Sequence, residues 1–268
     1  MTKAQVQTSP KTIQGINLLP PSEIRAIYSR LIPAEIHELF NLSADYYDSN
    51  GNDLIQMSCK PGGSDAEMSV FHRFGAPDPI LYGHITDTIS GQIHILLYTI
   101  NDPESERYNV DRMHDGSPTL LGAACRNIQE ELRAMHAGLA PGQIHRGLRL
   151  LQPAASQFEK FVQSLGHELY FAEPLFYHTA LQFERYGFSY QVGRKFMERI
   201  AAGFAPGGEL QSRLDGSTPF RQPEAINSLR LRSWAIHDGI LGEPFNNVTM
   251  YKRVGKSAGI NTCPECPW

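Results

Sequence analysis

Hydrophobic and polar positions alternate with two different periods along the chain. Between residues 53 and 100, apolar residues recur at every second position in short runs, which is the pattern of half-buried β-strands. The runs are DLIQMSCK, AEMSVFHRF, PILYGHITDT and QIHILLYTI, separated by the turn-like stretches PGGSD, GAPD and SG. Such short connections predict an antiparallel meander. The apolar run ILLYTI, at residues 95–100, predicts a central position for the last strand.

Elsewhere the apolar residues recur with helical spacing. Ser22 and Glu23 follow two prolines and precede a helical stripe, which predicts a helix start. Further helices are expected at 33–42, 119–139, 150–166, 176–186 and 194–204, and further strands at 167–175, 187–192, 228–239 and 246–254. The stretch ELRAMH within 119–139 could instead form a strand. The pattern predicts an α/β (α+β) fold with a mixed, largely antiparallel central sheet flanked by helices.

Length and composition suit one large domain. The chain has 268 residues, of which 41% are hydrophobic and 19% charged, so it can bury a substantial core. Residues 1–18 are polar and unpatterned, and we expect a mobile segment there. A single domain is expected over 19–254, followed by a C-terminal tail over 255–268.

The formal net charge of −4 gives no electrostatic case for nucleic acid or an anionic membrane as the main partner. No apolar run reaches the length that a bilayer requires, and the first residues lack the apolar core of a signal peptide. We therefore expect a cytoplasmic protein that acts on a small-molecule substrate. The sequence does not predict its oligomeric state.

The four cysteines fit a reducing compartment. Cys59 and Cys125 stand alone, and we interpret them as buried thiols. Cys263 and Cys266 form the motif CPEC near the C-terminus. A single C-x-x-C is half of a zinc site or a redox pair, but with no second motif visible we interpret it as part of a loose tail.

A turn with the sequence GQIHRGL, at residues 142–148, precedes a predicted helix. The first N–H groups of a helix have no partner within it, and the helix dipole adds partial positive charge. His145 and Arg146 add further positive charge. The turn therefore predicts an anion site that fits a pyrophosphate.

The stretch HTALQFERYGF, at residues 178–188, reads as a short helix that ends at Gly187. Together with the preceding turn it resembles the second half of the GNAT superfamily of N-acyltransferases, over residues 130–190. The helix ending A-x-x-Y-E-K-x-G-F of that family is matched by Ala180, Phe183, Glu184, Arg185, Gly187 and Phe188.

The resemblance implies a GNAT-like fold and transfer of an acyl group to an amine. The donor substrate would be acetyl-CoA or a longer acyl-CoA. Its pyrophosphate would contact Gln143, His145, Arg146, Gly147 and Leu148.

The chain also departs from the family pattern. Phe183 replaces the tyrosine that often protonates the leaving thiolate, and Arg149 stands where a small residue is usual. An arginine there would crowd an incoming phosphate. These departures favour an alternative, a catalytically inactive binding protein with a GNAT-like shape.

The candidate catalytic residues are His178, Glu131, Glu173 and His237. His178 or Glu131 would help to deprotonate the amine; the other interpretation of His178 is a buried or capping histidine. His237 and Asp238 end a predicted strand, where loops often carry function.

Two further interpretations stay open. A metal-dependent enzyme could use histidine and carboxylate ligands, although no metal-binding spacing is present and no metal ligand is assigned. The stretch RLDGSTPFR, at residues 213–221, is expected to be a surface loop, the alternative being a lid over a pocket.

Overall fold

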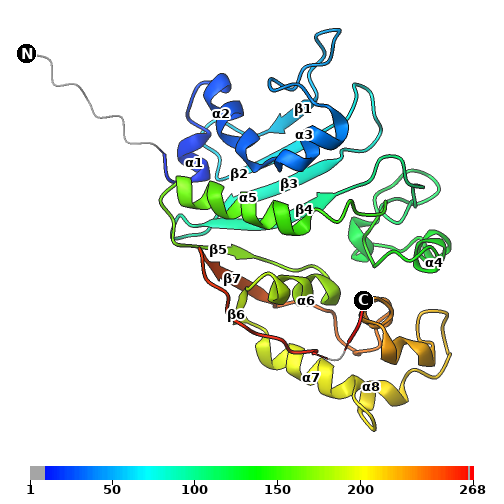
Figure 1. Ribbon diagram of the computed structural model, residues 1–268. Helices are drawn as coiled ribbons and strands as arrows, with labels where there is room; N and C mark the ends of the chain where they lie inside the picture. Colours follow the sequence, from blue (N-terminus) through cyan, green and yellow to red (C-terminus); the bar gives the residue numbers. More distant parts are fainter. Residues whose placement is uncertain (1–9, 265) are drawn as a thin grey trace, which may run out of the picture. The chain divides into compact units, whose positions relative to one another are not determined.

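A computed structural model describes residues 10–264 and 266–268, which divide into two compact units. The first unit holds the chain up to residue 100 together with 149–172 and 253–256. The second unit holds 101–148, 173–252 and the C-terminal residues from 257. Residues 1–9, for which the sequence predicts mobility, lie outside the described residues. Figure 1 shows the elements of both units.

The first unit is built on a mixed sheet. Its strands lie in the order β1 (Ile55–Ser58), β2 (Asp65–Val70), β3 (Leu81–Asp87), β4 (Ile93–Ile100) and β5 (Leu169–Ala172). Neighbouring strands from β1 to β4 run antiparallel, whereas β4 and β5 run parallel. The predicted meander and the mixed, largely antiparallel sheet are therefore confirmed.

Helices flank this sheet: α1 (Ile13–Ile16), α2 (Pro21–Tyr28), the 3₁₀ turn η1 (Ser29–Leu31), α3 (Ala34–Phe40) and α5 (Leu151–Ser164). The backbone N–H groups of Ile13 and Gln14 donate to the Asp87 carboxylate at 2.8 Å, which anchors α1 beside β3. The helix α1 thus lies within residues 1–18, where the sequence predicts a mobile segment without a helix. Phe158 of α5 packs on Tyr170 of β5, with ring centroids 5.2 Å apart.

The second unit is mainly helical. Its helices are η2 (Leu120–Gly122), α4 (Ile128–His136), α6 (Tyr177–Arg185), α7 (Arg194–Phe204), α8 (Glu209–Ser212), η3 (Pro223–Asn227) and α9 (Leu229–His237). The strands β6 (Ser189–Val192) and β7 (Thr249–Arg253) pair antiparallel. Gly187 has a φ of +84°, so it ends α6 in the left-handed conformation that the sequence predicts for it.

Two predicted elements of this unit are wrong. Residues 229–237 form the helix α9 instead of a strand, because Ser228 caps it by accepting a hydrogen bond from the Leu231 N–H at 3.3 Å. The helix predicted over 119–139 is confined to α4. Leu120, Leu121 and Gly122 all have positive φ, and Asn127 caps a new helix start. The ELRAMH stretch is helical.

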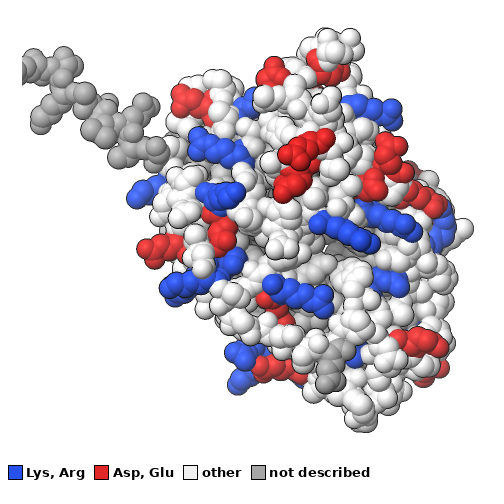
Figure 2. Space-filling model, in the orientation of Figure 1, with Lys and Arg blue, Asp and Glu red and all other residues white. Residues whose placement is uncertain are grey.

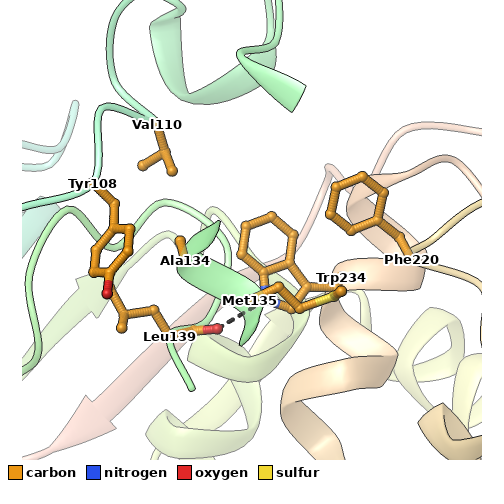
Figure 3. Packing of buried hydrophobic residues seen from close by; sticks show 7 residues of the cluster. All are labelled: Tyr108, Val110, Ala134, Met135, Leu139, Phe220 and Trp234. Atoms are coloured by element: carbon orange, nitrogen blue, oxygen red, sulfur yellow. Dashed lines mark hydrogen bonds between the residues drawn. The ribbon is translucent and has the colours of Figure 1, made fainter. Parts of the chain in front are cut away.

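Trp234 is the centre of a hydrophobic cluster in the second unit (Figure 3). Its ring is fully buried and stacks on Phe220 at a centroid distance of 5.4 Å. The indole N–H donates to the Leu139 carbonyl at 2.8 Å, which satisfies its polar group. This cluster joins α4 to α9 and so fixes the side chains that both helices present to the site described next.

The described residues include no helix that is long and apolar enough to cross a membrane. On the face shown in Figure 2, basic and acidic side chains are scattered among each other.

Candidate functional site

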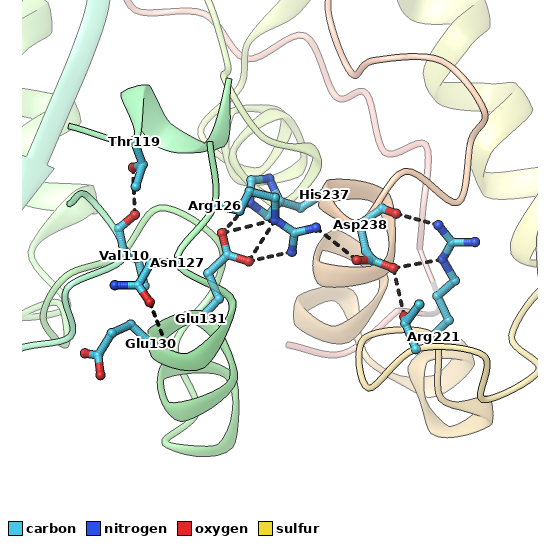
Figure 4. A network of polar contacts seen from close by, with 10 residues as sticks. Val110, Thr119, Arg126, Asn127, Glu130, Glu131, Arg221, His237 and Asp238 are labelled. Atoms are coloured by element: carbon cyan, nitrogen blue, oxygen red, sulfur yellow. Dashed lines mark hydrogen bonds and ion pairs between the residues drawn. The ribbon is translucent and has the colours of Figure 1, made fainter. Parts of the chain in front are cut away.

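Glu131 and His237, 106 positions apart in the chain, contact each other in the second unit (Figure 4). Glu131 lies in the first turn of α4 and His237 is the last residue of α9. The distance between His237 Nε2 and Glu131 Oε1 is 3.1 Å. The Glu131 side chain is 2% exposed and the His237 side chain is 12% exposed. When the neutral imidazole donates from Nε2 to the carboxylate, Nδ1 carries the lone pair and can accept a proton.

Arg126 joins this pair to a second carboxylate. Its Nε donates to Glu131 Oε2 at 2.9 Å, and its Nη1 donates to Asp238 Oδ1 at 2.9 Å. The guanidinium also lies 5.0 Å above the ring of Phe220. Sequence reasoning missed Arg126; its place just before the capping Asn127 is the only local signal.

Asp238 is held from the other side by the loop predicted at residues 213–221. Arg221 Nε donates to Asp238 Oδ2 at 2.9 Å, and Thr218 Oγ1 donates to the same oxygen at 2.8 Å. The network in Figure 4 therefore ties this loop to the C-terminal end of α9.

The network controls the charge of Glu131. Burial alone would raise the pKa of its carboxyl, but hydrogen bonds from His237 and Arg126 outweigh burial and lower the pKa. Burial alone would likewise lower the pKa of Arg126, and the carboxylates of Glu131 and Asp238 raise it instead. Glu131 is therefore ionised at neutral pH and positions His237.

His178 lies at the start of α6 and is only 5% exposed. Its Nδ1 is 2.8 Å from Ser233 Oγ, and its ring stacks on Phe176 at 5.6 Å. Burial, and next the charge of His237, lower the pKa of His178 to about 3. The imidazole is therefore neutral at physiological pH.

Aromatic rings and glycines shape the surroundings of both histidines. Phe176 stacks on His178 and meets His237 edge-on at 5.7 Å. A Cβ at Gly122 would lie 2.5 Å from His237 Cε1, and one at Gly142 would lie 2.4 Å from the Phe176 ring. Glycine at both positions therefore permits close approach to the rings.

The predicted phosphate loop is also in the second unit and is bound to residues 102–108. Gln143 Oε1 accepts from the Ala140 N–H at 2.7 Å. His145 is buried, with Nδ1 3.1 Å from the Ser105 carbonyl. The Arg146 N–H donates to Ser105 Oγ, and its Nη2 donates to the Ala137 carbonyl at 3.3 Å.

The remaining candidates are more open. Gly147 and Glu173 are exposed and Leu148 is half-buried. The structure therefore brings Glu131 and His237 together, puts His178 beside the same phenylalanine, and leaves Glu173 at the surface. Cys59 and Cys125 are half-buried, so the prediction that both are buried thiols is wrong.

A second feature of functional interest lies in the first unit, at strand β4. Only two residue pairs join β4 to β5, His94 with Phe171 and Ile95 with Ala172. Leu96 is a bulge without a partner on β3. Among the described strands, β4 therefore pairs only with β3 from Leu97 to Ile100.

Burial along β4 changes at the same point. The strand alternates between buried and half-buried residues up to Ile95, and residues 96–99 are then all half-buried. Backbone groups on such a strand edge can pair with an added extended chain.

Among the described residues, no group of three or more histidine, cysteine, aspartate or glutamate side chains is arranged to hold a metal ion. The carboxylates of Glu131 and Asp238 instead share the guanidinium of Arg126.

A scan against models of known protein families and searches of curated proteins and solved structures found no match to this chain.

Proposed function

We propose that the protein is an N-acyltransferase that takes its acyl group from acetyl-CoA or a longer acyl-CoA. The observation that carries this proposal is the edge of β4 beyond Ile95, which the parallel neighbour β5 leaves unpaired. The phosphopantetheine arm of CoA is an extended chain with amide groups. Such a chain can hydrogen-bond to a strand edge as an added strand does.

The resemblance of residues 130–190 to the GNAT superfamily supplies the reaction class for this proposal. An amine attacks a thioester only after it loses its proton, so a general base is needed. Within the second unit, His237, held by the Glu131 carboxylate, is the better candidate for such a base, because His178 is buried against Phe176 and its pKa is about 3.

The test measures whether acyl-CoA binds and where on the chain it binds. Acetyl-CoA and a long-chain acyl-CoA are titrated by calorimetry, and amide hydrogen exchange is then measured with and without the tighter ligand. We expect slower exchange in residues 96–100, while peptides from β2, which is paired on both sides, stay unchanged. Absence of binding by both ligands, or binding without protection at 96–100, would refute the proposal.

Transfer is tested by mass spectrometry of N-acyl products from a panel of amines. His237→Gln is expected to lower kcat by about 10²- to 10⁴-fold, the usual contribution of a general base, and to leave acyl-CoA affinity unchanged. His136→Gln, an exposed histidine of α4, is the matched control and should keep full activity.

A second candidate function is acyl-CoA binding without transfer. The ring of Phe183, at the position of the family's usual acid, stacks on Phe188 at 4.9 Å, so no proton donor is present there. Protection of β4 by acyl-CoA without product from any amine would favour this binding protein over the enzyme.

A further inference from the structure

Several of the described residues from 257 to 268 are held against the helices of the second unit. Thr262 donates through its N–H and its hydroxyl to the Glu184 carboxylate, at 2.8 and 2.7 Å. Farther along, the Leu229 N–H donates to the Pro267 carbonyl at 2.8 Å. The interpretation of this segment as a loose tail is therefore wrong for these residues, and the two cysteines between the anchors are held in place.

The two thiols differ in exposure. Cys266 is only 3% exposed, whereas Cys263 is half-buried and so is the more exposed of the two. One accessible and one buried sulfur in a C-x-x-C motif is the arrangement that allows attack by the first and resolution by the second.

A fixed cation lies beside the accessible sulfur. Arg232 Nη1 donates to Cys263 Sγ at 3.3 Å. The same guanidinium donates from Nε to the Ile226 carbonyl at 3.0 Å and lies 5.1 Å above the Phe204 ring. Because these contacts fix the guanidinium on α9, its positive charge stays beside Cys263 Sγ and stabilises the thiolate.

The electrostatics agree with this geometry. The hydrogen bond from the Cys266 thiol, opposed by burial and aided by the charge of Arg232, lowers the pKa of Cys263 to about 6. The same hydrogen bond and burial raise the pKa of Cys266. Both shifts favour Cys263 over Cys266 as the thiolate of the pair.

We propose that Cys263 and Cys266 form a thiol–disulfide exchange site for low-molecular-weight disulfides, with Cys263 as the attacking sulfur. The Cys263 thiolate bonds to one sulfur of the substrate disulfide, and the other leaves as a thiolate that takes up a proton. Cys266 then loses its proton and attacks Cys263 Sγ, which releases the second substrate sulfur as a thiol. One substrate disulfide is reduced to two thiols while Cys263 and Cys266 are oxidised to one disulfide.

A structural zinc site is the competing use of a C-x-x-C motif. Arg232 opposes it, because a fixed guanidinium at 3.3 Å repels a divalent cation bound to the same sulfur. No third ligand joins the pair among the residues that the structure describes. The site is independent of the proposed acyl transfer.

The first experiment follows alkylation of each cysteine by iodoacetamide as a function of pH, read by peptide mass spectrometry on the full chain. We expect the midpoint of Cys263 near pH 6. Cys59, whose pKa is raised first by burial, is the internal control and should react only at alkaline pH. Arg232→Gln should move the Cys263 midpoint toward the value of about 8.5 for a free thiol. A Cys263 midpoint at or above 8.5 in the unaltered chain would overturn the proposal.

The second experiment uses oxidised glutathione as the probe. The unaltered chain should form the Cys263–Cys266 disulfide and release two glutathione molecules, whereas Cys266→Ser should trap glutathione on Cys263. Cys266→Ala serves as a second variant, and circular dichroism confirms that each variant folds. No disulfide and no trapped adduct, or stoichiometric binding of added zinc that Cys263→Ser abolishes, would overturn the proposal.

Discussion

Lowering the pH should destabilise the protein through His178. The pKa of this buried histidine is lowered to about 3, first by burial, whereas an exposed histidine titrates near 6.5. Between these values the unfolded state binds a proton that the folded state excludes. Stability is therefore fully present above pH 6.5 and is lost as the pH falls toward 3.

The magnitude follows from the difference in proton binding. Each pH unit in which only the unfolded state is protonated costs about 1.4 kcal/mol, and the loss from pH 6.5 to pH 4.5 sums to about 2.3 kcal/mol. The environment of His178 supports a neutral ring, because Phe176 stacks on it and His237 adds like charge when protonated.

The assay is urea unfolding at pH 4.5, 5.5 and 6.5, which gives the free energy of unfolding at each pH. His178→Gln removes the titrating group and should flatten the pH dependence by about 2 kcal/mol over this range, whatever its effect on stability at pH 6.5. His136→Gln, at an exposed position, should run parallel to the unaltered chain. If the free energy of unfolding changed equally with pH in His178→Gln and in the unaltered chain, the reasoning would be refuted.

Two further changes test the network around Glu131. Glu131→Gln removes a buried partner of Arg126 and should lower the free energy of unfolding, measured in urea, by about 2–4 kcal/mol. Glu198→Gln, in an exposed ion pair, should cost nothing measurable. Equal losses for the two variants would contradict the structural importance of the Glu131–Arg126 pair. Gly122→Ala should destabilise more than Gly116→Ala by thermal melting. Both glycines have φ near +86°, at +88° and +85°, but only the Gly122 Cβ would collide, at 2.5 Å from His237, so equal melting temperatures would exclude that contact.

Local patterns in the sequence predict the meander well. Strands β2 and β3 bury alternate residues, and β4 does so up to Ile95, so the period suffices to predict them. The same reasoning fails at α9. The alternation of leucine and arginine from Leu229 to Arg232 imitates a strand, but Arg232 packs its side chain over Phe204 and so occupies a position that the pattern treats as solvent-facing.

The candidate site is harder to predict because its contacts are distant in sequence. Glu131 and His237 are both identifiable as chemical groups, yet nothing local shows that they touch at 3.1 Å. Their contact depends on the packing of α4 and α9 around Trp234, a tertiary interaction. Arg126 is missed because an arginine before a helix is ordinarily a solvated residue.

The arrangement of charges bears on the base role proposed for His237. Glu131 and Asp238 contribute two carboxylates, and Arg126 and Arg221 contribute two guanidinium groups. These charges balance without the imidazole, so His237 is not required as a cation to neutralise a buried carboxylate. With a neutral His237 ring, both carboxylates therefore still have a guanidinium partner. Without Arg126, the buried Glu131 carboxylate would lose its guanidinium partner and keep only the contact with His237.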